Sequence, residues 1–266
     1  MNKSTWRTRF ILFICFAFLY IPMIYLIIFS FNSGKFITYW SGFSLKWYGI
    51  LFQNHDLLHA ALISLKIAFI SATLASIIGI CGAVALSRFD YFRGKALFKA
   101  IAVAPLVMPE IIIGLSLLMF FVSLEQLIGW PDGRGQLTII IAHTTITTAY
   151  VIAVVQSRLA GMDPALEEAA MDLGAPPFKA FMQVTFPIIF PAVAVGWVLA
   201  FMISFDDVVI ASFVSGPGST TLPMKIFSSL KFGISPELNA LATILILFIF
   251  LVFSIFFYIK KIKHKK

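Results

Sequence analysis

Six long apolar runs divide this sequence, and they limit its possible folds more than any other feature. A helix needs about 20 apolar residues to cross the hydrocarbon core of a bilayer, and each run reaches or nearly reaches that length. With 60% hydrophobic and only 12% charged residues, a soluble fold could not bury the apolar surface. We predict an all-α integral membrane protein with six transmembrane helices in one domain, residues 1–266. The expected spans are residues 10–31, 60–86, 100–124, 137–155, 188–214 and 238–259.

The Lys and Arg residues are distributed unequally between the two sides of such a domain. If both termini share one side, that side carries 14 of the 20 and the opposite side carries five, with Lys66 inside the second span. By the positive-inside rule both termini are expected in the cytoplasm. The net charge of +8 is then explained by topology and contact with anionic lipid headgroups, and no nucleic-acid partner is expected.

One acid-bearing segment, residues 163–187, lies between the fourth and fifth apolar runs, on the predicted cytoplasmic side. Asp163 is expected to cap a short helix whose first residue is Pro164. Gly174, followed by Ala-Pro-Pro, is expected to end that helix. The sequence therefore predicts a cytoplasmic loop containing one helix of about ten residues, which is marginally stable by itself.

The predicted helix has two distinct faces. One face is apolar at helical spacing and consists of Leu166, Ala169, Ala170 and Leu173. Glu168 and Asp172 project to another side. Helices that lie on a membrane surface usually carry Lys and Arg on the polar face, so acids at an anionic leaflet disfavour that arrangement. We expect this helix to dock into another protein.

These residues resemble the signature E-A-A-x3-G-x9-I-x-L-P of the membrane subunits of bacterial ATP-binding cassette (ABC) importers. It reads Glu168-Ala169-Ala170, then Gly174, then Val184-Thr185-Phe186-Pro187, with Val and Phe replacing Ile and Leu. The resemblance implies a type I importer permease of MetI-like fold, in which the loop 163–187 contains the coupling helix that binds a separate ATPase. The residues implied in coupling are Glu168, Ala169, Ala170, Leu173, Gly174 and Pro187.

Longer stretches, among them "APLVMPEIIIGLSLL" and "GWVLAFMISFDDVVIASF", are similar to the C-type permeases of polyamine importers, putrescine systems in particular. That resemblance implies a bacterial inner-membrane protein whose partners are a sister permease, an ATPase dimer and a periplasmic polyamine-binding protein. The sequence has no G-x-x-x-x-G-K-[ST] loop. We therefore expect ATP and Mg²⁺ on the partner ATPase and no cofactor, metal or catalytic residue in this chain, which is not predicted to be an enzyme.

Polyamines are flexible cations, so their pathway through a bilayer requires negative charge. Glu110 lies about ten residues, roughly 15 Å, into the third span, after Pro105 and Pro109. Asp206 and Asp207 lie in the outer half of the fifth span. These three acids are the candidates for the pathway. Neighbours on a regular helix point about 100° apart, so we prefer Asp206, with capping of a broken helix or contact with the sister subunit as alternatives for Asp207.

Two other polar residues in the spans have plausible structural roles. Lys66 could pair with one of the acids, but we favour an amine that extends outward to the membrane surface. His143 in the fourth span is expected to be a hydrogen-bonded core residue rather than part of the pathway.

Alternative functions remain at this point. Within the same class, the chain could belong to an importer for another small solute. From a different class, it could be a self-sufficient cation channel or carrier, although the docking helix would then have no task. A membrane-embedded enzyme is least favoured, since the sequence shows no paired histidines, Ser/Lys dyad or metal cluster. Co-purification with an ATPase and dependence on ATP would distinguish a coupled subunit from a lone carrier.

Overall fold

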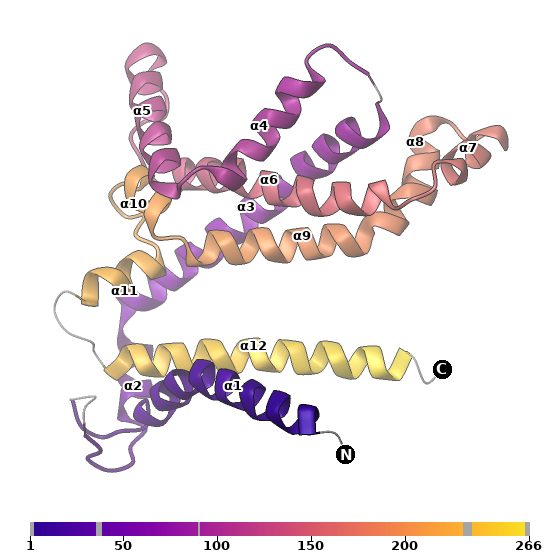
Figure 1. The fold of residues 1–266 in the computed structure, drawn as a ribbon. Coiled ribbons are helices and arrows are strands. Elements are labelled where there is room, and N and C mark those ends of the chain that lie inside the picture. The colour runs from indigo at the N-terminus through magenta and orange to yellow at the C-terminus, as the bar shows by residue number, and fades with distance from the viewer. Residues whose placement is uncertain (1–2, 36–38, 90, 231–235, 264–266) are drawn as a thin grey trace. The chain divides into compact units, whose positions relative to one another are not determined.

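A computed structural model describes residues 3–35, 39–89, 91–230 and 236–263 of the protein. Apart from one isolated bridge between Asn32 and Phe43, these residues form helices and the turns that connect them. The chain divides into two compact units, one comprising Met1–Leu58 and Ile226–Lys266 and the other His59–Lys225. Figure 1 shows the helices of each unit.

The first unit consists mainly of α1 (Lys3–Phe29), α2 (Lys46–Gln53) and α12 (Pro236–Lys263), and α12 contacts both other helices (Figure 1). The turn after α1 is held by Trp47, whose indole N–H donates to the Asn32 carbonyl at 2.7 Å. None of the apolar stretch of α1 is buried, as expected of a helix whose surroundings are lipid.

The second unit is organised around α6, the most buried of its long helices. α9 packs along α6, and α4 and α10 also contact it (Figure 1). Close approach of α3 depends on small residues, because Ala72, Ala75 and Ala83 are fully buried in one cluster with Val151 of α6. The helices of this unit are α4 (Lys95–Val107), α5 (Glu110–Ile128), α6 (Gln136–Ala160), α7 (Ala165–Asp172), α8 (Pro177–Ala180), the π-helix η1 (Phe181–Thr185), α9 (Phe186–Asp206), α10 (Val209–Val214) and, each crossing one of its boundaries, α3 (His55–Arg88) and α11 (Leu222–Leu230).

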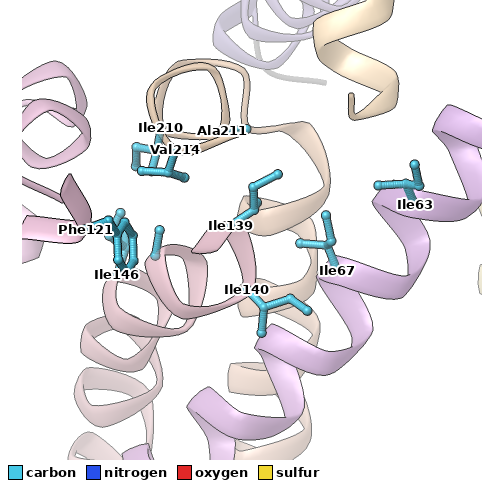
Figure 2. Packing of buried hydrophobic residues seen from close by; sticks show 10 residues of the cluster. Ile63, Ile67, Phe121, Ile139, Ile140, Ile146, Ile210, Ala211 and Val214 are labelled. Carbon is cyan, nitrogen blue, oxygen red and sulfur yellow. The ribbon is translucent and has the colours of Figure 1, made fainter. Parts of the chain in front are cut away.

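A second apolar cluster joins four helices at the opposite end of α6 from α7. Figure 2 shows side chains from α3, α5, α6 and α10 in this cluster. Its buried members include Ile63, Ile67, Phe121, Ile139, Ile140, Ile146, Ile210, Ala211 and Val214. Because α10 has only six residues, its position depends on this packing.

The prediction of an all-α membrane protein is confirmed. Among the described residues, five helical segments are long and apolar enough to cross a membrane, and α12 contributes the shorter apolar stretch Pro236–Phe248. The five are Thr8–Phe29, His55–Arg88, Glu110–Ile128, Gln136–Ala160 and Pro177–Asp206.

The expected span 100–124 differs from the observed structure, because it is divided between α4 and α5. Met108 and Pro109 both have extended backbones, with ψ angles of 139° and 135°. Proline lacks an N–H and disfavours helical geometry in the residue before it. Glu110 is therefore the first residue of α5, and its depth cannot be counted along one continuous helix.

The expected span 188–214 is also divided, at Asp207. Asp207 has an extended backbone with a ψ angle of 129°, and α9 ends at the residue before it. Its carboxylate accepts hydrogen bonds from the backbone N–H groups of Ile210 and Ala211, at 3.3 and 2.7 Å. A side chain that bonds the following backbone in this way favours starting a new helix over continuing the old one.

Candidate functional site

The two helix breaks meet at one cavity of about 470 Å³ in the second unit. The break between α4 and α5 contributes Pro105, Met108 and Glu110, and the break between α9 and α10 contributes Asp206 and Asp207. The lining side chains that are polar are Glu110, His143, Thr147, Tyr150, Ser204, Asp206 and Asp207. The structure thus brings the three acids predicted from sequence to a single space, although about 100 residues separate Glu110 from the aspartates.

Asp207 has a structural role, because its carboxylate is hydrogen-bonded within the fold. Only 8% of its side chain is exposed, and it caps α10 through the two backbone hydrogen bonds described above. One of its carboxylate oxygens also lies 3.1 Å from His143 Nε2. Capping of a broken helix, the first alternative for this residue, is therefore confirmed.

His143 connects α6 to this helix break. Its ring is 3% exposed, with Nδ1 2.7 Å from the Ser204 hydroxyl and Nε2 3.1 Å from Asp207. The prediction of a hydrogen-bonded core histidine is confirmed. Because Ser204 lies on α9 and Asp207 precedes α10, one imidazole fixes both sides of the break against α6.

Glu110 and Asp206 differ from Asp207 in having no salt-bridge partner in the described part of the chain. Both residues are exposed, and both line the cavity. Since α9 ends at Asp206, the angular separation expected on a regular helix does not apply to the aspartate pair. Asp206 also lies at the negative end of the α9 dipole, where a cation is favoured. The cavity therefore presents two carboxylates to a cation.

Lys66 does not neutralise this charge. Its amine donates to the side-chain oxygen of Gln136, the first residue of α6, at 3.2 Å. This contact fits an amine directed toward the end of the span. The alternative, a bridge to Glu110 or to an aspartate, is not formed among the residues that the structure describes.

A larger cavity of about 760 Å³ lies between α3, α4, α5 and α6, but no charged side chain lines it. Its walls include Ile78, Phe98 and Phe120, with the hydroxyls of Thr145 and Thr148 as minor polar features. Such a surface suits lipid chains or apolar side chains better than a cation. The smaller polar cavity is therefore the candidate for the solute.

The loop between α6 and α9 contains the predicted short helix, α7. Asp163 accepts a hydrogen bond from the Ala165 N–H at 3.0 Å, and Pro164 already has helical dihedral angles. At the other end, the N–H of Gly174 bonds the Met171 carbonyl at 2.9 Å and the next N–H bonds Ala170 at 3.1 Å. That pair of bonds is a Schellman motif. Gly174 adopts a φ of +89°, which side chains rarely allow.

α7 buries no residue against its own chain. Glu167 and Ala170 are partly covered, and the other six of its eight residues are exposed. Leu166 is 50% exposed, and Leu173, directly after the helix, is 90% exposed. Of the predicted apolar face, Ala170 turns inward, whereas Leu166, Ala169 and Leu173 are open together with Glu168. Pro187 lies apart from this surface, in the first turn of α9.

Comparison with known families identifies the chain. Residues 75–262, well over half of its length, match the family model described as "binding-protein-dependent transport system inner membrane component". The chain belongs to this family. This inner membrane component is accordingly a multi-pass membrane protein and a permease subunit rather than an enzyme in itself.

Two curated relatives align with nearly the whole inner membrane component. It is 54% identical to the putrescine transport system permease protein PotI of Escherichia coli K12 over 244 residues, covering 92% of this chain and 86% of that one. It is 46% identical to the spermidine/putrescine transport system permease protein PotC of the same strain over 231 residues, covering 87% and 85%.

A solved bacterial ABC transporter, involved in the import of the acidic polysaccharide alginate, has a chain of the same fold. The TM-score is 0.71 with 98% of both chains covered, at 16% identity. This match confirms the predicted fold of a type I importer permease. At such low identity it carries no information about the solute.

One feature of this inner membrane component was missed at the sequence level. The carboxylate of Glu167, the acid before the signature Glu168, lies 2.8 Å from Arg88 Nη2 and accepts a hydrogen bond from the Thr185 hydroxyl at 3.0 Å. Arg88 ends α3 and Thr185 ends η1. The only hint in the sequence is the pair of adjacent acids, one of which is outside the signature.

Proposed function

We propose that this chain is one of two membrane-spanning subunits of an ATP-driven importer that moves polyamines from the periplasm to the cytoplasm. Putrescine is the first candidate and spermidine the second. The observation that carries the proposal is the polar cavity at the two helix breaks, where Glu110 and Asp206 face the same space without a salt-bridge partner among the described residues.

The charge of the cavity suits an organic dication. Two carboxylates within one cavity can compensate two ammonium groups, and the aromatic side chain of Tyr150 lines the same wall. At the end of α9 the carbonyls of the last turn lack helical N–H partners and add negative potential beside Asp206. The names of the relatives PotI and PotC, which mention putrescine and spermidine, support the same chemical class.

The exposed surface of α7 supports coupling to a separate ATPase. We propose that Leu166, Glu168, Ala169, Leu173 and Gly174 enter a cleft of an ATPase dimer that binds ATP and Mg²⁺. The small side chain of Ala169 permits close approach of the partner backbone, and the open apolar side chains Leu166 and Leu173 gain from burial in the complex. Both chain termini and α7 would then lie in the cytoplasm. A sister permease and a periplasmic polyamine-binding protein would complete the complex.

The proposal is tested by purifying a tagged chain with its native partners from membranes and reconstituting the complex in proteoliposomes. With the binding protein outside and ATP on the ATPase side, labelled putrescine should accumulate, and omission of ATP should abolish uptake. Spermidine as competitor would measure the breadth of selectivity. A self-sufficient carrier would transport without ATP. An importer for another solute would retain its ATPase but show no stimulation by putrescine and its binding protein.

A further inference from the structure

The short helix α7 is attached to its own chain through very few side chains. Only Glu167 and Ala170 are partly covered, and Glu167 carries the only side-chain hydrogen bond or ion pair of α7 among the described residues. An eight-residue helix with an open apolar surface gains little packing energy against its own chain, although it contacts α8 and η1. Among its side chains, Glu167 makes the polar contacts that relate α7 to the membrane spans.

Those contacts connect α7 to two different long helices. Arg88 is the last residue of α3, a helix of 34 residues, and its Nη2 lies 2.8 Å from Glu167 and 3.6 Å from the sulfur of Met162. Thr185, 1% exposed, donates its hydroxyl to the same carboxylate oxygen from the residue before α9. Glu167 thus connects α7 to the end of α3 and to the start of α9. The other end of α9, at Asp206, lines the cavity. We call this set of contacts, formed by Glu167, Arg88 and Thr185, the joint.

The environment of this joint makes the contact stronger than an ordinary surface ion pair. The side chains of Arg88 and Glu167 are each 20% exposed, whereas fully solvated pairs contribute little because water and entropy oppose them. A second donor on the same oxygen, Thr185, further restricts the carboxylate. Removing one member leaves a charge that is largely covered and without its partner.

We propose that Glu167 is a positioning residue that transmits movement of α7 to α3 and α9, and thereby couples ATPase closure to the spans. This inference rests on the proposed function, because it requires that α7 is the surface on which the ATPase acts. Neighbouring residues on a helix point about 100° apart. Glu168 is exposed and so open to a partner, while Glu167 is partly covered and contacts Arg88 and Thr185 of the protein's own chain.

The test uses the full complex carrying Glu167→Gln, Arg88→Gln or the exchanged pair R88E/E167R. Two quantities are measured, the ATPase retained per permease on a tag column and the solute taken up per ATP hydrolysed. The single variants should retain the ATPase but lower the uptake per ATP about fivefold to tenfold. The exchanged pair should recover uptake to within about threefold of the parent. Glu125→Gln, the same substitution at an exposed position of α5, is the matched control and should leave both quantities unchanged.

Three results would refute the role proposed for Glu167. They are full coupling in Glu167→Gln, no recovery in the exchanged pair, or loss of the ATPase from the single variants at unchanged permease yield, which would place Glu167 in the docking surface instead. If a single variant fails to accumulate, recovery of yield and uptake by the exchanged pair still supports the pairing. Absence of an ATPase or of ATP-dependent uptake in the parent complex would refute the proposed function itself, which keeps the two failures distinguishable.

Discussion

Replacement of Gly174 by tryptophan separates the effect of the backbone from the effect of a binding partner. Gly174 has a φ of +89°, and a Cβ atom added there would have no atom within 4 Å apart from its chain neighbours. The left-handed conformation costs a non-glycine residue about 1–2 kcal/mol. Since the Cβ atom adds no clash and position 174 is exposed, we expect alanine and tryptophan to destabilise the isolated permease by about the same amount, 1–2 kcal/mol. Any additional loss with tryptophan must come from a surface outside the chain.

Gly94 provides the matched control. It has a φ of +85°, precedes α4, is exposed, and likewise has no atom within 4 Å of an added Cβ atom apart from its chain neighbours. Gly94→Trp should therefore impose the same backbone cost as Gly174→Trp. The assay compares the thermal unfolding midpoints of the purified permeases in detergent with the ATPase retained per permease on a tag column. We expect similar midpoints for the two tryptophan variants and a loss of at least about tenfold in retained ATPase only at Gly174. Gly174→Ala should retain most of it.

Two outcomes would refute the reasoning. Normal uptake and normal ATPase retention in Gly174→Trp would remove the docking surface from α7. An equal loss of ATPase in Gly94→Trp would show that general destabilisation, and not occupancy of the surface by a bulky ring, is responsible.

The remaining predictions concern the cavity and the core. Asp206→Asn should lower putrescine uptake at least about tenfold at unchanged ATPase retention, because a cation loses a charged partner, and Asp132→Asn in an exposed turn is the matched control. Asp207→Asn should instead destabilise the permease by about 1–3 kcal/mol, measured by thermal unfolding, because it weakens a buried cap. His143→Leu should do the same, as it leaves Asp207 without its ring partner. Ile189→Ala, fully buried between α9 and its neighbours, should cost about 2–5 kcal/mol with no specific effect on uptake per ATP.

The ends of α7 could be predicted because the signals are local. The Asp163 carboxylate accepts a hydrogen bond from a backbone N–H two residues later. The N–H of Gly174, which precedes Ala-Pro-Pro, bonds a carbonyl three residues earlier. Helical spacing predicted one apolar face with Glu168 on another side, but it did not predict which residues turn toward the protein's own chain. In the structure Glu168 is exposed together with Leu166, Ala169 and Leu173, and Ala170 and Glu167 are partly covered.

The two helix breaks were less accessible to prediction, although their residues were recognised as unusual. The predicted span 100–124 runs through Pro109 without a break, because proline can also be accommodated as a kink within a span. At Asp207 the break depends on the partners of a carboxylate that also lines the cavity. His143, 64 residues earlier in the chain, helps to decide it, and hydropathy cannot register such a contact.

The same division of roles occurs at both pairs of adjacent acids. In Asp206-Asp207, one carboxylate is consumed by a helix cap and an imidazole and the other faces the cavity. In Glu167-Glu168, one is held by Arg88 and the other is exposed. A carboxylate that is hydrogen-bonded within the fold contributes rigidity. Its neighbour thereby gains a fixed position and keeps its charge free of an internal partner.

Substitution at the hydrogen-bonded acid of each pair should therefore change stability or the transmission of movement, whereas substitution at the open acid should change binding. The comparison of Asp206→Asn with Asp207→Asn tests that separation at the cavity, and the comparison of Glu168→Gln with Glu167→Gln tests it at α7. If both members of a pair gave the same loss at unchanged stability, the open and satisfied carboxylates would have to act as one unit.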